Sequence, residues 1–160
     1  MRANPFATVV ILITVFVAMM LNSIPLPQWA VWYRPEWVGL VVIYWWMMMP
    51  NQVSLGWAWL IGLLIDVLYG SVLGQHALAM LILAYVVQRF YLQIRLYPTW
   101  QQSLYVMAVI LLYQSIIFIT QGMLHQIHTG WLFWLPAITS MILWPWVAMI
   151  LRDLRRRIRI

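Results

Sequence analysis

Residues 56–74 read GWAWLIGLLIDVLYGSVLG, and this stretch decides how the rest of the chain is interpreted. It contains Asp66, the one acidic residue that lies inside an apolar segment. Gly62, Asp66, Gly70 and Gly74 recur every four residues, so on a continuous helix they would form one stripe where a second helix can approach closely. A carboxylate in such a stripe costs several kcal/mol unless it has a partner. Asp66 therefore marks either a structural polar joint or a functional site.

The composition places the whole chain in a membrane. Of its 160 residues, 66% are hydrophobic and only 8% are charged, and the mean hydropathy is +0.89. Soluble domains do not reach these values. We therefore expect an all-α integral membrane protein with one transmembrane domain, residues 1–160, and no room for a soluble catalytic domain. Cysteine is absent, which excludes disulfides, a thiol nucleophile and thiolate metal ligands.

The net charge of +6 comes from nine arginines, and five of them fall in the last nine residues. They define a basic tail, residues 152–160, directly after an apolar segment. A basic cluster in this position is typical of contact with anionic lipid headgroups. We therefore expect anionic lipids, and not nucleic acid, as the partner of the tail.

Six apolar stretches are separated by Pro, Gly and polar residues, and each is expected to cross the membrane as a helix. Pro35 is expected in the first turn of the second helix, and Thr99 with Gln102 resembles a capping box at the start of the fifth. The sixth helix should have Pro136 in its first turns and end near Leu151. The other five are expected at residues 5–24, 36–49, 53–69, 75–91 and 100–121.

The arginines also predict the orientation. With six spans both termini lie on one side, and eight of the nine arginines lie on that side with them. The positive-inside rule then places both termini in the cytoplasm and leaves Arg34 alone outside. Asp66 falls near the outer end of the third helix, on the same side as Arg34 and Glu36.

Asp66 is interpreted first as a structural group. Its carboxylate could cap exposed amides at the turn formed by residues 70–74, or it could pair with Arg34. The alternative is a proton carrier. That role is disfavoured because the sequence shows no Lys, Arg or His on an adjoining turn to act as a relay partner.

The three histidines are candidate metal ligands. His125 and His128 have the i, i+3 spacing that can place two imidazoles on one helical face. They fall in a polar loop with no third ligand nearby except His76, whose distance the sequence does not give. We expect solvated loop histidines, with no metal site and no cofactor.

No catalytic residue can be nominated. No sequence pattern pairs a serine with a base, and a GxSxG elbow is absent. Ser54, Ser115 and Ser140 are expected to pack or to bond between helices, and Gln114, Thr120 and Gln121 either line a polar cavity or bond across helices, the second being favoured. Most of the twelve tryptophans lie near expected helix ends, which is typical of an interfacial belt. Pro145 should kink the sixth helix.

Four fragments in a fixed order carry a family resemblance. They are RPEW at residues 34–37, IYWWMMMP at residues 43–50, DVLYGSVLG at residues 66–74 and LWPW at residues 143–146. Together they resemble the MreD family of bacterial rod shape-determining membrane proteins. The resemblance covers nearly the whole chain.

The resemblance implies a non-enzymatic scaffold in the bacterial inner membrane that binds MreC and helps to maintain rod shape and lateral peptidoglycan synthesis. Through MreC it implies association with MreB, RodZ, RodA and a class B penicillin-binding transpeptidase. It also implies a fold similar to the substrate-binding subunits of energy-coupling-factor transporters. The positions that match the family, expected to serve the fold or the MreC interface, are Arg34, Pro35, Asp66, Gly70, Gly74 and Pro145.

Two other function classes stay open at this point. A small-molecule carrier or substrate-binding membrane subunit is suggested if Asp66, Gln114 and Gln121 face one cavity. An intramembrane enzyme is disfavoured for lack of a nucleophile and a base. The small-residue stripe could also serve a homodimer.

Overall fold

The computed structural model describes residues 5–124 and 130–157, and within them every regular element is helical. The expectation of an all-α protein is therefore confirmed. The elements are α1 (Pro5–Ser23), α2 (Gln28–Val31), α3 (Trp37–Met48), α4 (Leu55–Tyr69), α5 (Gln75–Ile94), α6 (Thr99–Met123), the 3₁₀-helix η1 (Trp131–Trp134) and α7 (Leu135–Arg157).

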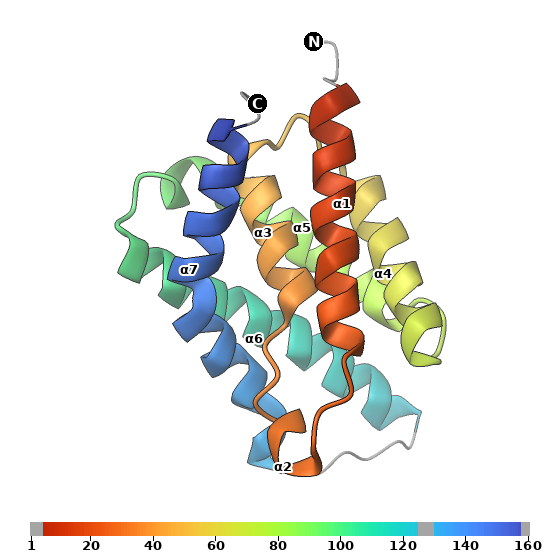
Figure 1. The fold of residues 1–160 in the computed structure, drawn as a ribbon. Helices are drawn as coiled ribbons and strands as arrows, with labels where there is room; N and C mark the ends of the chain where they lie inside the picture. Colours follow the sequence, from red (N-terminus) through yellow and green to blue (C-terminus); the bar gives the residue numbers. More distant parts are fainter. Residues whose placement is uncertain (1–4, 125–129, 158–160) are drawn as a thin grey trace.

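Helix α3 forms the centre of the bundle. Ten of its twelve residues are buried, and it packs against α1, α5 and α7. Figure 1 shows it between α1 and α7. A helix that is apolar on every side is stable either among other helices or in contact with lipid, and the burial of α3 shows that it is surrounded by helices. The centre of the protein is therefore the second apolar stretch of the sequence.

Several tryptophans belong to this core. Trp45, Trp46 and Trp144 have almost no exposed surface. The indole Nε1 of Trp45 donates to Thr14 Oγ1 at 2.9 Å, and that of Trp46 donates to the Val53 carbonyl at 3.1 Å. The expected interfacial belt therefore does not account for these residues. An indole can be buried when its N–H finds a partner, as two of these do.

The start of α3 differs slightly from the expectation. Glu36 is the N-cap residue, so Pro35 lies just before the helix and not in its first turn. The Glu36 backbone N–H donates to Ser140 Oγ of α7 at 3.0 Å. Ser140 thus makes the interhelix bond that was expected of it, and it ties the beginning of α3 to α7.

Helices α4 and α5 form a tightly packed antiparallel pair. A Cβ atom on Gly62 would lie 2.3 Å from the Cα of Ala77, so only glycine permits this approach of the two backbones. The small-residue stripe is not continuous, because α4 ends at Tyr69. Gly70 and Gly74 instead have φ values of 61° and 101° and shape the turn between the helices.

The beginning of α6 corrects another expectation. Pro98 is its N-cap residue, and no side chain caps the helix, so the Thr99–Gln102 capping box is wrong. The Gln102 amide Nε2 donates instead to the carbonyls of Ile94 and Tyr97, at 3.2 and 3.1 Å. The Ile94 carbonyl lies at the end of α5 and the Tyr97 carbonyl lies in the connection, so Gln102 ties the first turn of α6 to the segment that precedes it.

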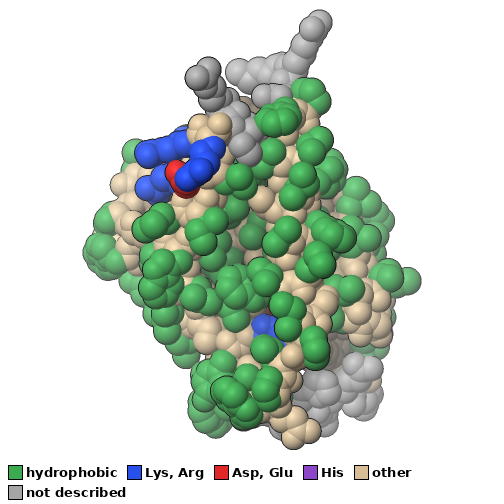
Figure 2. Space-filling view, viewed as in Figure 1, with side chains coloured by type: hydrophobic (Ala, Val, Ile, Leu, Met, Phe, Trp, Pro, Cys, Tyr) green, Lys and Arg blue, Asp and Glu red, His purple; other side chains and the backbone are tan. Residues whose placement is uncertain are grey.

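Helix α7 is longer than expected. It contains Pro145 in its interior and continues past Leu151 to Arg157. Residues 152–157 of the expected basic tail are thus helical. Three arginines in the last turn, Arg155, Arg156 and Arg157, are favourable beside the negative end of the helix dipole. Figure 2 shows blue side chains gathered near this end of the molecule, on a face that is otherwise largely apolar.

Four of the described helical segments are long and apolar enough to cross a membrane: α1, α5, α6 and residues 131–157. Helices α3 and α4 are apolar but have only 12 and 15 residues. The structure therefore shows four candidate spans where six were expected. The start of α1 and the end of α7 lie at the same end of the molecule, and α2 lies at the opposite end (Figure 1).

Candidate functional site

Asp66 lies in the last turn of α4 and is fully buried. Its Oδ1 accepts hydrogen bonds from Ser71 Oγ at 2.8 Å and from the His76 backbone N–H at 3.0 Å. Its Oδ2 accepts from the backbone N–H of Gly74 at 2.8 Å and, more weakly, from that of Ala77 at 3.4 Å. The carboxylate is thus held by backbone and side-chain donors from a single segment, residues 71–77.

These bonds replace a missing helix cap. The N-cap residue of α5 is Gly74, which has no side chain to accept from the first free N–H groups of the helix. Asp66 supplies the acceptor from the preceding helix, and its negative charge lies at the positive end of the α5 dipole. The expectation that Asp66 caps amides at the turn of residues 70–74 is confirmed.

His76 is the partner that the sequence analysis missed. Its Nδ1 lies 2.8 Å from Asp66 Oδ1. An ionised carboxylate can only accept, so the ring nitrogen that faces it carries the proton. The signal was present: His76 directly follows a turn that folds α5 back on α4, so residues eight to ten positions after Asp66 return to its side.

The cluster of Asp66, Ser71 and His76 contains the three residue types of a hydrolase triad but not its geometry. In a triad the serine and the carboxylate contact opposite nitrogens of the imidazole. Here Ser71 Oγ lies 3.3 Å from the same Nδ1 that faces Asp66, and it bonds the same carboxylate oxygen. The arrangement is that of a polar joint between α4 and α5.

No metal site was found in the described part of the chain. Among residues 5–124 and 130–157, no three His, Cys, Asp or Glu side chains gather closely enough to hold an ion. His76 is committed to Asp66. His125 and His128 lie outside the described residues, so the expectation about them stays a prediction.

Arg34 does not pair with Asp66, and that expectation is wrong. Its two terminal nitrogens donate to the backbone carbonyls of Asn22 and Ile24. These carbonyls lie at the end of α1, where the helix leaves them without internal partners, and a cation is favourable there. The guanidinium Nε is buried and has no hydrogen-bond partner among the described residues.

Glu36 lies between this arginine and the first turn of α3, outside the helix itself. Burial raises the pKa of Glu36 to about 7, and the positive charge of Arg34 opposes part of that rise. The region around Arg34 therefore contains a carboxyl group that changes its charge near neutral pH.

Gln114 was expected either to line a cavity or to bond across helices. Its Nε2 donates to the Phe133 carbonyl of η1 at 3.0 Å, which confirms the second interpretation. Thr120 bonds within α6, to the carbonyls of Ile116 and Ile117. Pro35 precedes the partly buried Glu36, Pro145 follows the buried Trp144, and the place of both prolines in any interface stays a prediction.

The family model for rod shape-determining protein MreD matches residues 3–154. The chain belongs to the MreD family. It is also 36% identical over 144 residues to the rod shape-determining protein MreD of Haemophilus influenzae, which covers 90% of this chain and 89% of that protein. No solved structure matches it. Family membership supports a role in determining rod shape, and MreD is a shape-determining membrane family, not a known enzyme family.

Proposed function

We propose that this chain is a non-enzymatic membrane scaffold of the wall-elongation machinery that binds MreC and supports lateral peptidoglycan synthesis. The observation that carries the proposal is the family match over residues 3–154. The site agrees with it, because the most chemically suggestive cluster, Asp66 with Ser71 and His76, is used to hold two helices together.

The proposal includes a six-helix arrangement in the inner membrane with both termini in the cytoplasm. Helices α3 and α4, about 18 and 22 Å long at 1.5 Å per residue, would cross beside longer neighbours. Arg34 and the turn at residues 70–74 would then face the periplasm, away from the arginines of α7. The proposed similarity to substrate-binding subunits of energy-coupling-factor transporters rests on the family resemblance.

The surface proposed for MreC is formed by residues 25–36 and 70–75. These segments expose large apolar side chains: Trp29 is 76% exposed and Leu73 is 69% exposed, with Tyr33 and Val72 also accessible. Aromatic side chains of this kind are enriched where protein interfaces concentrate their binding energy. MreB, RodZ, RodA and a class B penicillin-binding transpeptidase would join through MreC.

The test is affinity purification of the tagged chain from its native membrane in mild detergent, followed by mass spectrometry. We expect a single-span protein with a periplasmic coiled coil, together with wall synthases. The double variant Trp29→Ala, Leu73→Ala should lose them, and the matched variant Trp100→Ala, at an exposed tryptophan of α6, should not. Recovery of an ATPase pair or a bound small molecule, without wall proteins, would overturn the proposal.

The carrier alternative requires a carboxylate that can exchange its proton or contact a ligand. Asp66 has no exposed surface, and the donors of residues 71–77 surround both of its oxygens. Gln114, another of the three residues on which the alternative depended, donates from its side-chain amide to the Phe133 carbonyl of η1. These contacts favour the scaffold.

A further inference from the structure

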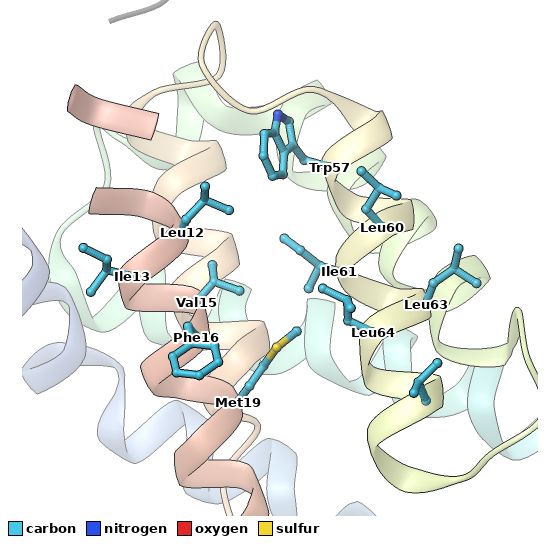
Figure 3. Close-up of a pocket in the computed structure, with 11 residues that line it drawn as sticks. Leu12, Ile13, Val15, Phe16, Met19, Trp57, Leu60, Ile61, Leu63 and Leu64 are labelled. Carbon is cyan, nitrogen blue, oxygen red and sulfur yellow. The ribbon is translucent and has the colours of Figure 1, made fainter. Parts of the chain in front are cut away.

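A groove runs along the surface between α1 and α4. Its main part has a volume of about 700 Å³, and all its lining side chains are apolar. Figure 3 shows Leu12 and Met19 of α1 facing Ile61 and Leu64 of α4 across this space. Volumes of about 300–1,000 Å³ are typical of sites that hold small molecules.

The groove continues toward the end of the molecule that carries Arg34. A second hollow of about 730 Å³ shares Phe16, Met19 and Leu64 with the first. A third, of about 420 Å³, adjoins the second and is lined by Asn22 and Arg34. Among the described residues that line the three hollows, Arg34 alone is charged, so the apolar groove ends at a cation.

Two buried polar atoms at the Arg34 end of the groove have no hydrogen-bond partner among the described residues. Arg34 uses its two terminal nitrogens on backbone carbonyls but keeps a buried Nε without a partner. Asn22 is 3% exposed, and its side-chain oxygen also has no partner among the described residues. A bound group that carries a negative charge and a hydroxyl would satisfy both.

The groove is as long as one membrane leaflet. Leu12 and Ser23, at its two ends on α1, are eleven residues apart, which is about 17 Å along a helix. This is roughly half of the ~30 Å hydrocarbon core. Beyond Leu12, the hollow lined by Thr8, Gln52 and Trp57 has a volume of only about 10 Å³.

We propose that this groove binds one anionic phospholipid from the leaflet at the Arg34 end, with the phosphate at Arg34 and an acyl chain between α1 and α4. A transmembrane helix is a poorer fit for two reasons. It would extend through both leaflets, whereas the groove closes after one. Transmembrane helix interfaces are also enriched in small residues, and the described residues that line the main part of the groove include no Gly, Ala, Ser or Thr.

The first experiment measures headgroup preference. The full-length protein is stripped of lipid in detergent, and dioleoyl phosphatidylglycerol or dioleoyl phosphatidylcholine is titrated while bound lipid is counted by native mass spectrometry. The phosphatidylglycerol should bind more tightly. Arg34→Gln should weaken it roughly tenfold, the effect of losing a charge-assisted contact, and leave phosphatidylcholine unchanged. Arg156→Gln, in the arginine patch at the other end of the protein, is the matched control.

The second experiment fills the groove without touching Arg34. Leu64→Trp places a larger side chain in the apolar part and should reduce binding of phosphatidylglycerol. Ile142→Trp on α7 is the control, since Ile142 and Leu64 are 54% and 58% exposed. This variant decides the question if Arg34→Gln fails to fold.

Four results would overturn the proposal. The two phospholipids could bind equally to the unmodified protein, or the two tryptophan variants could bind phosphatidylglycerol equally. Displacement of phosphatidylglycerol by an equimolar isoprenyl phosphate would assign the groove to a different lipid class. Displacement by the transmembrane peptide of a single-span partner would assign it to a helix.

Discussion

Asp66 and Arg34 have opposite charges but the same role, because each bonds free backbone groups at the end of a helix. Asp66 accepts from the backbone N–H groups at the beginning of α5. Arg34 donates to the backbone carbonyls at the end of α1. In both places one side chain satisfies groups that a helix terminus leaves free, and its charge has the sign that the helix dipole favours.

The two sites differ in how many of their hydrogen-bonding atoms already have partners. Both oxygens of Asp66 are occupied, and the side chain has no contact with solvent. Arg34 is only partly buried, keeps one unpaired nitrogen and borders a groove. A charge at a helix end is purely structural when its hydrogen bonds are saturated, and it can also hold a ligand when they are not.

The largest effect is expected at the saturated site. Asp66→Ala leaves several N–H groups and the His76 ring without an acceptor, and we expect a loss of about 3–5 kcal/mol of folding free energy. Denaturation of the purified protein in mixed micelles measures it. Asp153→Ala removes an exposed carboxylate that pairs with Arg157 and should have little effect. If Asp66→Ala folds as stably as the unmodified protein, the joint is not structural.

The Arg34 region should show a pH dependence that Glu36 causes. The pKa of Glu36 is about 7 in the folded protein and 4.5 in the unfolded chain, so between these values the folded state binds more protons. Stability should therefore fall as the pH rises from 5 to 8, by no more than about 3 kcal/mol, because one pKa unit corresponds to about 1.4 kcal/mol. Thermal unfolding across this range measures the slope. Glu36→Gln should flatten it, and an unchanged slope would assign the dependence elsewhere.

Arg34→Gln should cost less stability than Asp66→Ala. It removes a charged donor pair from the end of α1, which is worth about 1.5–3 kcal/mol, but it leaves no unpaired charge buried. Arg34→Lys keeps the charge but places its donors on a single nitrogen in place of the two that bond Asn22 and Ile24, so its stability should fall between those of the unmodified protein and Arg34→Gln. If Arg34→Gln is as damaging as Asp66→Ala, the contrast between a saturated and an open site fails.

The close approach of α4 and α5 gives a further test of the saturated joint. A Cβ on Gly62 would meet the backbone of Ala77 at 2.3 Å, and backbone cannot move as a side chain can. Gly62→Ala should push the helices apart and cost about 1–3 kcal/mol, as overpacking does. Gly122→Ala is the control, because a Cβ on Gly122, inside α6, would have no neighbour within 4 Å. Equal stability of the two variants would contradict the tight contact.

The sequence predicted what depends on neighbouring residues. The apolar stretches became helices, and Asp66 was correctly assigned as a cap because the amides that it contacts follow within eleven positions. The predicted pairing of Arg34 with Asp66 was wrong. Opposite charges on the same side of the membrane suggest an ion pair, but they do not show which acceptor lies nearest to the arginine. The free carbonyls at the end of α1 depend on where that helix stops and how the chain turns, which residue types alone do not give. The Thr99–Gln102 box failed for the same reason.

The smallest expected effect concerns the turn that Asp66 closes. Gly70 has a φ of 61°, and a Cβ there would meet no atom within 4 Å. Gly70→Ala therefore tests backbone strain alone, and it should cost about 1–2 kcal/mol because a left-handed conformation is unfavourable for an L-residue. Gly70→Asn should recover part of this loss, since Asn tolerates that conformation better. If alanine and asparagine cost the same, the turn has changed its shape, and the hydrogen bonds to Asp66, not the glycine, hold α4 and α5 together.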